Sequence, residues 1–104
     1  MNWQVITIEQ AIQLEKLGIL ETSNQSWVKD FGTDKHELVE WNDFENGYFH
    51  NAYNLSEIAV MLGYTFVKSN VKEAADQLIQ EIQVGSSTAK DCNARLQEAK
   101  SQSF

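Results

Sequence analysis

The residues with the greatest scope for chemistry in this 104-residue chain are its two histidines, His36 and His50. If a two-residue turn at Asn46-Gly47 joins two strands, Asp43 lies across the ladder from His50. A carboxylate that orients an imidazole is a genuine catalytic device, but a surface ion pair has the same appearance. A reaction centre would also need a hydroxyl that converges on this pair in a cleft. The sequence does not place one, so we predict that the protein is not an enzyme.

Metal and cofactor chemistry is not predicted either. Zinc needs three or four convergent ligands, and the carboxylates near the histidines lack the characteristic spacing. The stretch 42–47 superficially suggests a calcium loop, but with Gly47 as its sixth position Phe44 and Tyr53 fall where oxygen ligands are required. The five glycines are too widely spaced for a phosphate-binding loop. We therefore expect no metal, no cofactor and no small-molecule substrate, and we expect the single cysteine, Cys92, to be a packing residue.

Aromatic residues are concentrated in the middle of the chain, where nine of the eleven lie between residues 27 and 66. One interpretation is that Trp27, Trp41 and Tyr53 fill a small core between a thin sheet and its helices. The other is an exposed patch near the tip of a hairpin, with aromatic anchors and an acidic edge, as in protein-binding sites. The predicted protein-binding residues are Trp41, Phe44, Tyr48 and Phe49, with Glu40, Asp43 and Glu45 at the rim.

The charge of the chain is distributed as unevenly as its aromatics. The formal net charge is −7, and all of it falls in residues 1–66, which hold ten acidic residues against three lysines. Residues 67–104 hold five acidic and five basic residues, and Arg95 is the only arginine. Phosphate contacts need clustered lysine and arginine, so the composition argues against a nucleic-acid partner. It favours a protein partner or self-association.

Local signals predict the elements that position these residues. Thr7 is the expected N-cap and Gln10 the capping-box residue of a first helix, which runs to residue 17 and ends at Gly18. Three strands follow, with a hairpin turn at Asn46-Gly47 between the last two that sets Phe44 opposite Phe49. The strands are expected at residues 26–31, 37–44 and 48–53.

Three further helices are predicted in the C-terminal half, at residues 55–62, 71–84 and 88–100, with Ser69-Asn70 as the cap of the second. Gly63 ends the first of them, and residues 64–68 are either a short strand or an extended connection. The last helix has a thin apolar face, so we expect it to fray or to need a partner. The fold class is therefore α+β: an N-terminal helix, a small antiparallel sheet with an Asn-Gly hairpin, then two or three C-terminal helices.

Length and composition fit a single domain spanning 1–104, with a compact body at 1–85 and a terminal helix at 86–104 that depends on a partner. The first residues lack the basic region and long apolar run of a signal peptide. No apolar stretch approaches the roughly 20 residues needed to cross a bilayer. We therefore expect a cytoplasmic protein without membrane contact.

The segment Leu55–Gly63 suggests an alternative function, because it is similar to the first helix and turn of a helix-turn-helix. That motif favours a small residue where Ala59 stands and glycine where Gly63 stands. The expected apolar positions of the recognition helix hold Ser69 and Lys72 instead, and the next predicted helix starts too late for a tight turn. A DNA-binding regulator is therefore the second hypothesis and not the first.

Four short motifs also occur in a recognisable order: Leu-Glu-Lys-Leu-Gly-Ile at 14–19, Ser-Trp-Val at 26–28, Ala-Tyr-Asn-Leu-Ser-Glu-Ile at 52–58 and Met-Leu at 61–62. This order resembles a loose group of short uncharacterised proteins from Bacteroides-type bacteria and from phages and mobile elements. Relatives in that group often have proline after the Met-Leu pair, where this chain has Gly63. The resemblance implies no known activity, but it favours a small accessory protein over a housekeeping enzyme.

Three functional hypotheses follow from these patterns. The first is a non-enzymatic accessory protein that acts through protein–protein interaction, as a homodimer or as a binder of a host factor. The second is the helix-turn-helix-like regulator. The third is an acidic mimic of nucleic acid that occupies a DNA-binding protein, which requires carboxylates spaced along one surface.

Overall fold

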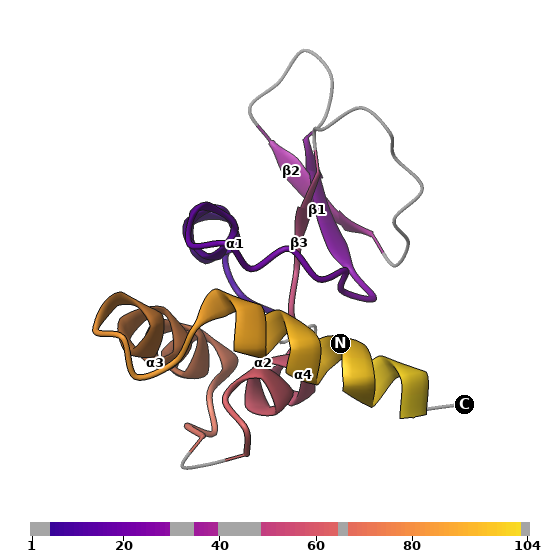
Figure 1. Ribbon diagram of the computed structural model, residues 1–104. Coiled ribbons are helices and arrows are strands. Elements are labelled where there is room, and N and C mark those ends of the chain that lie inside the picture. The colour runs from indigo at the N-terminus through magenta and orange to yellow at the C-terminus, as the bar shows by residue number, and fades with distance from the viewer. Residues whose placement is uncertain (1–4, 30–34, 40–48, 65–66, 103–104) are drawn as a thin grey trace.

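The computed structural model describes residues 5–29, 35–39, 49–64 and 67–102 (Figure 1). For Phe49 it describes the backbone only. Figure 1 shows three helices gathered at one end of the molecule and the strands at the other, with the first helix between them. The elements in chain order are α1 (Ile8–Lys16), β1 (Ser26–Lys29), β2 (His36–Val39), β3 (Phe49–Asn51), α2 (Leu55–Met61), α3 (Val71–Gln83) and α4 (Ala89–Gln102).

This order of helix, antiparallel strands and helices confirms the predicted α+β class. The local capping chemistry explains why the helices begin where they do. Thr7 caps α1 and forms the predicted capping box with Gln10, since each residue's side chain accepts a hydrogen bond from the other's backbone N–H. Asn54 and Glu57 form the same reciprocal pair at the start of α2. Asn70 caps α3, as expected from the sequence.

The sheet has the order β2-β1-β3, and both pairings are antiparallel. Over the described residues, the strands on either side of Asn46-Gly47 both pair with β1, a strand order that the sequence did not predict. Phe49 therefore lies opposite Val28, and His50 lies opposite Trp27. Asn46-Gly47, Asp43 and Phe44 lie outside the described residues. The predicted pairs Phe44–Phe49 and Asp43–His50 therefore stay predictions, and a turn signal alone does not indicate that β1 lies between β2 and β3.

Gly18, with φ +102°, and Gly63, with φ +77°, end α1 and α2 in the left-handed conformation, as the sequence predicts, and Gly85 does the same after α3 with φ +83°. Gly18 has a second role, because a Cβ built on it would lie 3.2 Å from the Cβ of Ala89 at the start of α4. The absence of a side chain at Gly18 therefore allows α4 to approach the end of α1 closely.

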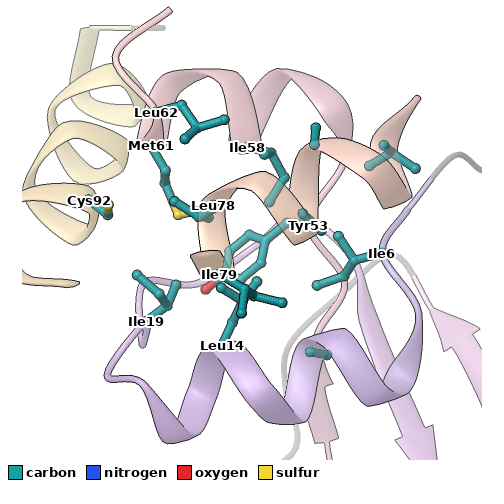
Figure 2. Close-up of a cluster of buried hydrophobic side chains, with 14 of the residues drawn as sticks. Ile6, Leu14, Ile19, Tyr53, Ile58, Met61, Leu62, Leu78, Ile79 and Cys92 are labelled. Atoms are coloured by element: carbon teal, nitrogen blue, oxygen red, sulfur yellow. The ribbon is translucent and has the colours of Figure 1, made fainter. Parts of the chain in front are cut away.

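The hydrophobic core joins all four helices. Figure 2 shows Tyr53 at its centre, with Leu14 of α1, Ile58 of α2 and Leu78 of α3 pointing toward the same interior. Cys92 of α4 is fully buried in this cluster, so it packs as predicted. Desolvation in this site raises the pKa of its thiol, which disfavours the reactive thiolate.

Tyr53 combines an apolar position with one buried polar contact. Its ring is almost completely buried, and its hydroxyl donates a hydrogen bond to the backbone carbonyl of Glu21. Burial raises the pKa of Tyr53 above the ordinary tyrosine value, and the negative charges of Glu57 and Glu21 act in the same direction. The phenol therefore stays protonated in the folded protein at pH values where it ionises in the unfolded chain.

Replacing Tyr53 by phenylalanine is expected to lower the free energy of unfolding by about 1 kcal/mol at neutral pH, because one buried hydrogen bond is lost. The protonated Tyr53 phenol makes its full contribution to the free energy of unfolding below a pH of about 10. This contribution is lost as the pH rises further, because the phenol then ionises in the unfolded chain but not in the folded protein. The wild-type protein should therefore lose stability more steeply above that pH, by up to roughly 1 kcal/mol per pH unit. Urea unfolding at several alkaline pH values gives the pH dependence of the free energy of unfolding for the wild type and for Tyr53→Phe. Equal slopes for the two proteins would contradict the prediction.

Helix α4 contributes Cys92 and Leu96 to the core, and polar side chains add further contacts to the rest of the chain. The side-chain amide of Asn93 donates to the carbonyl of Gly18 at 2.8 Å, and its oxygen accepts from the backbone N–H groups of Leu20 and Glu21 at 3.0 and 3.1 Å. Arg95 donates to the carbonyl of Met61 at 2.8 Å, at the C-terminal end of α2. These bonds connect α4 to segments more than thirty residues away in the sequence.

No helix among the described residues has both the length and the apolar composition that crossing a membrane requires.

Candidate functional site

The predicted protein-binding patch falls mainly outside the described residues. Trp41, Phe44 and Tyr48 lie there, as do the predicted rim residues Glu40, Asp43 and Glu45. Phe49 lies in β3, and only its backbone is described. The patch therefore stays a prediction.

Two described residues bear on the prediction that aromatic side chains fill the core. Tyr53 is almost completely buried in the core, as expected. Trp27 is partly buried against that core, and its indole N–H donates to the carbonyl of Ile6 at 2.9 Å. Trp41, the third residue of the interpretation, lies outside the described residues.

Among the described residues, the carboxylate that contacts His50 comes from helix α1, and the predicted partner Asp43 lies outside them. The Nδ1 atom of His50 lies 2.7 Å from Oε2 of Glu15 in α1. The ring centroid of His36 lies 6.2 Å from that of His50. Among the described residues, no group of three or more histidine, cysteine, aspartate or glutamate side chains is arranged to hold a metal ion. The Glu15 carboxylate can orient the imidazole of His50. Among the described contacts, no third group joins these two side chains to form a metal site.

A hollow with a volume of about 450 Å³ lies between α2 and α4. A second hollow of about 280 Å³ adjoins it and shares Val60, Tyr64, Ala99 and Gln102. We call the two together the α2–α4 groove. Its apolar wall consists of Val60, Leu96, Ala99 and the Tyr64 ring, and its polar lining consists of Asn24, Ser56, Glu57, Arg95, Glu98, Lys100 and Gln102.

Tyr64 is the most unusual residue of the groove. It follows Gly63 at the end of α2 and has φ +61°, which makes it the one non-glycine residue with positive φ in the described part of the chain. A residue with a Cβ is strained in this region, at a cost of about 1–2 kcal/mol. Its side chain is nevertheless 73% exposed, so this conformation does not serve to bury the ring.

Glu57 lies at the other end of the groove and is only 7% exposed. Its Oε1 atom accepts hydrogen bonds from the Ser23 hydroxyl at 2.8 Å and from the Asn54 backbone N–H at 3.0 Å. Its Oε2 atom accepts a single long bond of 3.4 Å from the Asn24 backbone N–H. A carboxylate oxygen can accept two good hydrogen bonds, so Oε2 retains acceptor capacity.

Both basic residues of the groove, Lys100 and Arg95, already donate hydrogen bonds to groups outside it. Lys100 donates to the Glu21 carboxylate at 3.1 Å and to the carbonyl of Thr22, so its charge is paired outside the groove. Arg95 holds the last turn of α2 through Met61, where a positive charge is favourable at a helix C-terminus. Spare acceptor capacity therefore lies at the Glu57 end, and spare donors lie at the Arg95 end.

Sequence spacing alone does not predict this groove. It indicates a helix at Leu55–Leu62 that is similar to the first half of a helix-turn-helix, and it gives Tyr64 no role beyond that of one aromatic residue among nine. In the structure, residues 62–70 separate α2 from α3, which is longer than the three- or four-residue turn of that motif. A large aromatic directly after a helix-ending glycine was the available signal, but the groove also needs α4, which sequence spacing cannot place.

In comparisons with protein-family models, with curated proteins and with solved structures, the chain has no significant match.

Proposed function

We propose that this protein is a small non-enzymatic accessory protein that binds another protein through the α2–α4 groove. The observation that carries the proposal is Tyr64, a large ring that is 73% exposed and held by a strained backbone beside an open groove. Backbone strain persists where the surrounding structure imposes it and is concentrated at functional sites. Tyrosine is also among the residues that contribute most to binding energy at protein interfaces.

The composition of the groove supports the same conclusion. Val60, Leu96 and Ala99 form an apolar wall, and polar side chains surround it. An apolar centre with a polar rim is the usual anatomy of a protein interface. The volume of about 450 Å³ is sufficient for one or two side chains of a partner.

Site-specific photocrosslinking in living cells tests this proposal. Benzoylphenylalanine in place of Tyr64 is expected to crosslink to one defined protein, which is either a host factor or a second copy of this chain. The same amino acid in place of Gln97, which is exposed on α4 and does not line the groove, is the matched control. Mass spectrometry of the crosslinked products identifies the partner.

A blocking variant makes the result specific to the groove. Ala99→Arg places a long charged side chain across the apolar wall and should abolish the crosslink from position 64 while the chain stays folded by circular dichroism. Identical products from positions 64 and 97, or an unchanged product in the Ala99→Arg protein, would refute the proposal.

A further inference from the structure

We infer that the Glu57 end of the α2–α4 groove receives a lysine or arginine side chain of the partner protein. This inference rests on the proposed function and specifies the chemistry of its ligand. Three features of the groove carry it: a buried carboxylate with unused acceptor capacity, an apolar wall next to it, and an exposed aromatic ring.

The carboxylate provides the site for a positive charge. Glu57 is 7% exposed, and its Oε2 atom has one hydrogen bond of 3.4 Å, whereas Oε1 has two of 3.0 Å or less. A carboxylate oxygen can accept a second hydrogen bond, so Oε2 has room for another donor. An ammonium or guanidinium group that donates to Oε2 supplies it with a charge-assisted bond.

The wall and the ring match the rest of such a side chain. Lysine and arginine carry aliphatic stems that pack on apolar surface while their charged ends make polar contacts. Val60 and Ala99 are partly exposed and offer that surface in the same hollow as Glu57 and Tyr64. A cation near the face of a tyrosine ring gains further attraction.

The charges around the groove are compatible with this ligand. Lys100, which lines the same hollow as Glu57, is paired with Glu21. The net charge of −7 attracts basic partners and speeds their association. Arg95 has spare donors at the opposite end of the groove, so an acidic side chain is the competing ligand, and the test includes it.

Titration of the full chain with four blocked tripeptides, followed by backbone amide NMR shifts, tests the inference. The peptides are acetyl-Ala-X-Ala-amide with X as lysine, arginine, norleucine or glutamate. The lysine and arginine peptides should shift amides of 56–60, 64 and 96–100, with dissociation constants on the order of 1 mM. Norleucine has the lysine stem without the charge, and it should bind at least tenfold more weakly.

Two substitutions separate charge from folding. Glu57→Gln keeps an acceptor for Ser23 and Asn54 but removes the negative charge, and it should weaken lysine-peptide binding about tenfold. Gln102→Lys adds a cation to the groove lining and should weaken binding at least threefold. Gln97→Lys makes the same charge change on α4 outside the groove and should leave binding unchanged.

The possible outcomes are distinct. Equal binding of norleucine and lysine, preferential binding of glutamate, or no binding of the basic peptides would overturn the inference. If the crosslink from position 64 persists while Glu57→Gln leaves partner affinity unchanged, recognition of a basic side chain is wrong and docking in the groove stands. If that crosslink is also absent, both proposals fail.

Discussion

Replacing Asn93 by alanine is expected to lower the free energy of unfolding by about 2 kcal/mol. The variant loses three hydrogen bonds, to the carbonyl of Gly18 and to the backbone N–H groups of Leu20 and Glu21. Each such bond contributes about 1 kcal/mol, and the better helix propensity of alanine returns about 0.5 kcal/mol. Chemical denaturation followed by circular dichroism measures the difference.

The control for Asn93→Ala is Gln97→Ala, four residues along the same helix on its exposed side. That variant should change stability by no more than about 0.5 kcal/mol. Hydrogen exchange provides an independent measurement, since the amides of Leu20 and Glu21 should lose protection only in the Asn93 variant. Equal stability of the two variants would mean that α4 is held by its apolar contacts and not by Asn93.

Replacing Tyr64 by glycine is expected to have opposite effects on stability and on binding. Relief of the left-handed strain gains about 1–2 kcal/mol, and the greater chain entropy of glycine costs about 0.5–1 kcal/mol. The net result is a free energy of unfolding that is higher by about 0.5–1 kcal/mol, because a ring that is 73% exposed contributes little packing. Affinity for the crosslinked partner should fall by about 2 kcal/mol, or roughly 30-fold, as for other tyrosines at the centre of interfaces.

Tyr64→Asn separates the ring from the backbone, because asparagine tolerates positive φ and lacks an aromatic side chain. It should lose partner affinity as the glycine variant does, with stability between that of the glycine variant and the wild type. Thermal and urea unfolding give the stabilities, and titration with the identified partner gives the affinities. If Tyr64→Gly lowers stability instead, the ring makes packing contacts that outweigh its strain, and the main argument for a functional role is lost.

Local chemistry allowed much of this fold to be predicted. The capping box of Thr7 and Gln10, the helix-ending Gly18 and Gly63, and the cap at Asn70 act over three or four residues, and all are present in the structure. The antiparallel sheet was also expected, but its strand order was not. Sheet pairing is a competition between segments far apart in sequence, and β1 takes the central place between β2 and β3.

The candidate site was much less accessible to sequence reasoning. Glu57 and Tyr64 are close in sequence, but the groove exists only because α4 packs against α2 about thirty residues later. Besides the buried Cys92 and Leu96, α4 is positioned by hydrogen bonds from Asn93 and Arg95 to backbone groups, and such bonds leave no hydrophobic pattern in the sequence.

The sequence by itself determined where the helices of this protein begin and end, because caps and left-handed glycines act within one helical turn. It also determined the acidic charge of the chain and the apolar faces that build the core. The tertiary structure alone decided which strand is central, which carboxylate meets His50, and where Tyr64 and Glu57 face a common groove. These features depend on contacts between segments that are far apart in the sequence, and local sequence patterns do not indicate which of these segments meet.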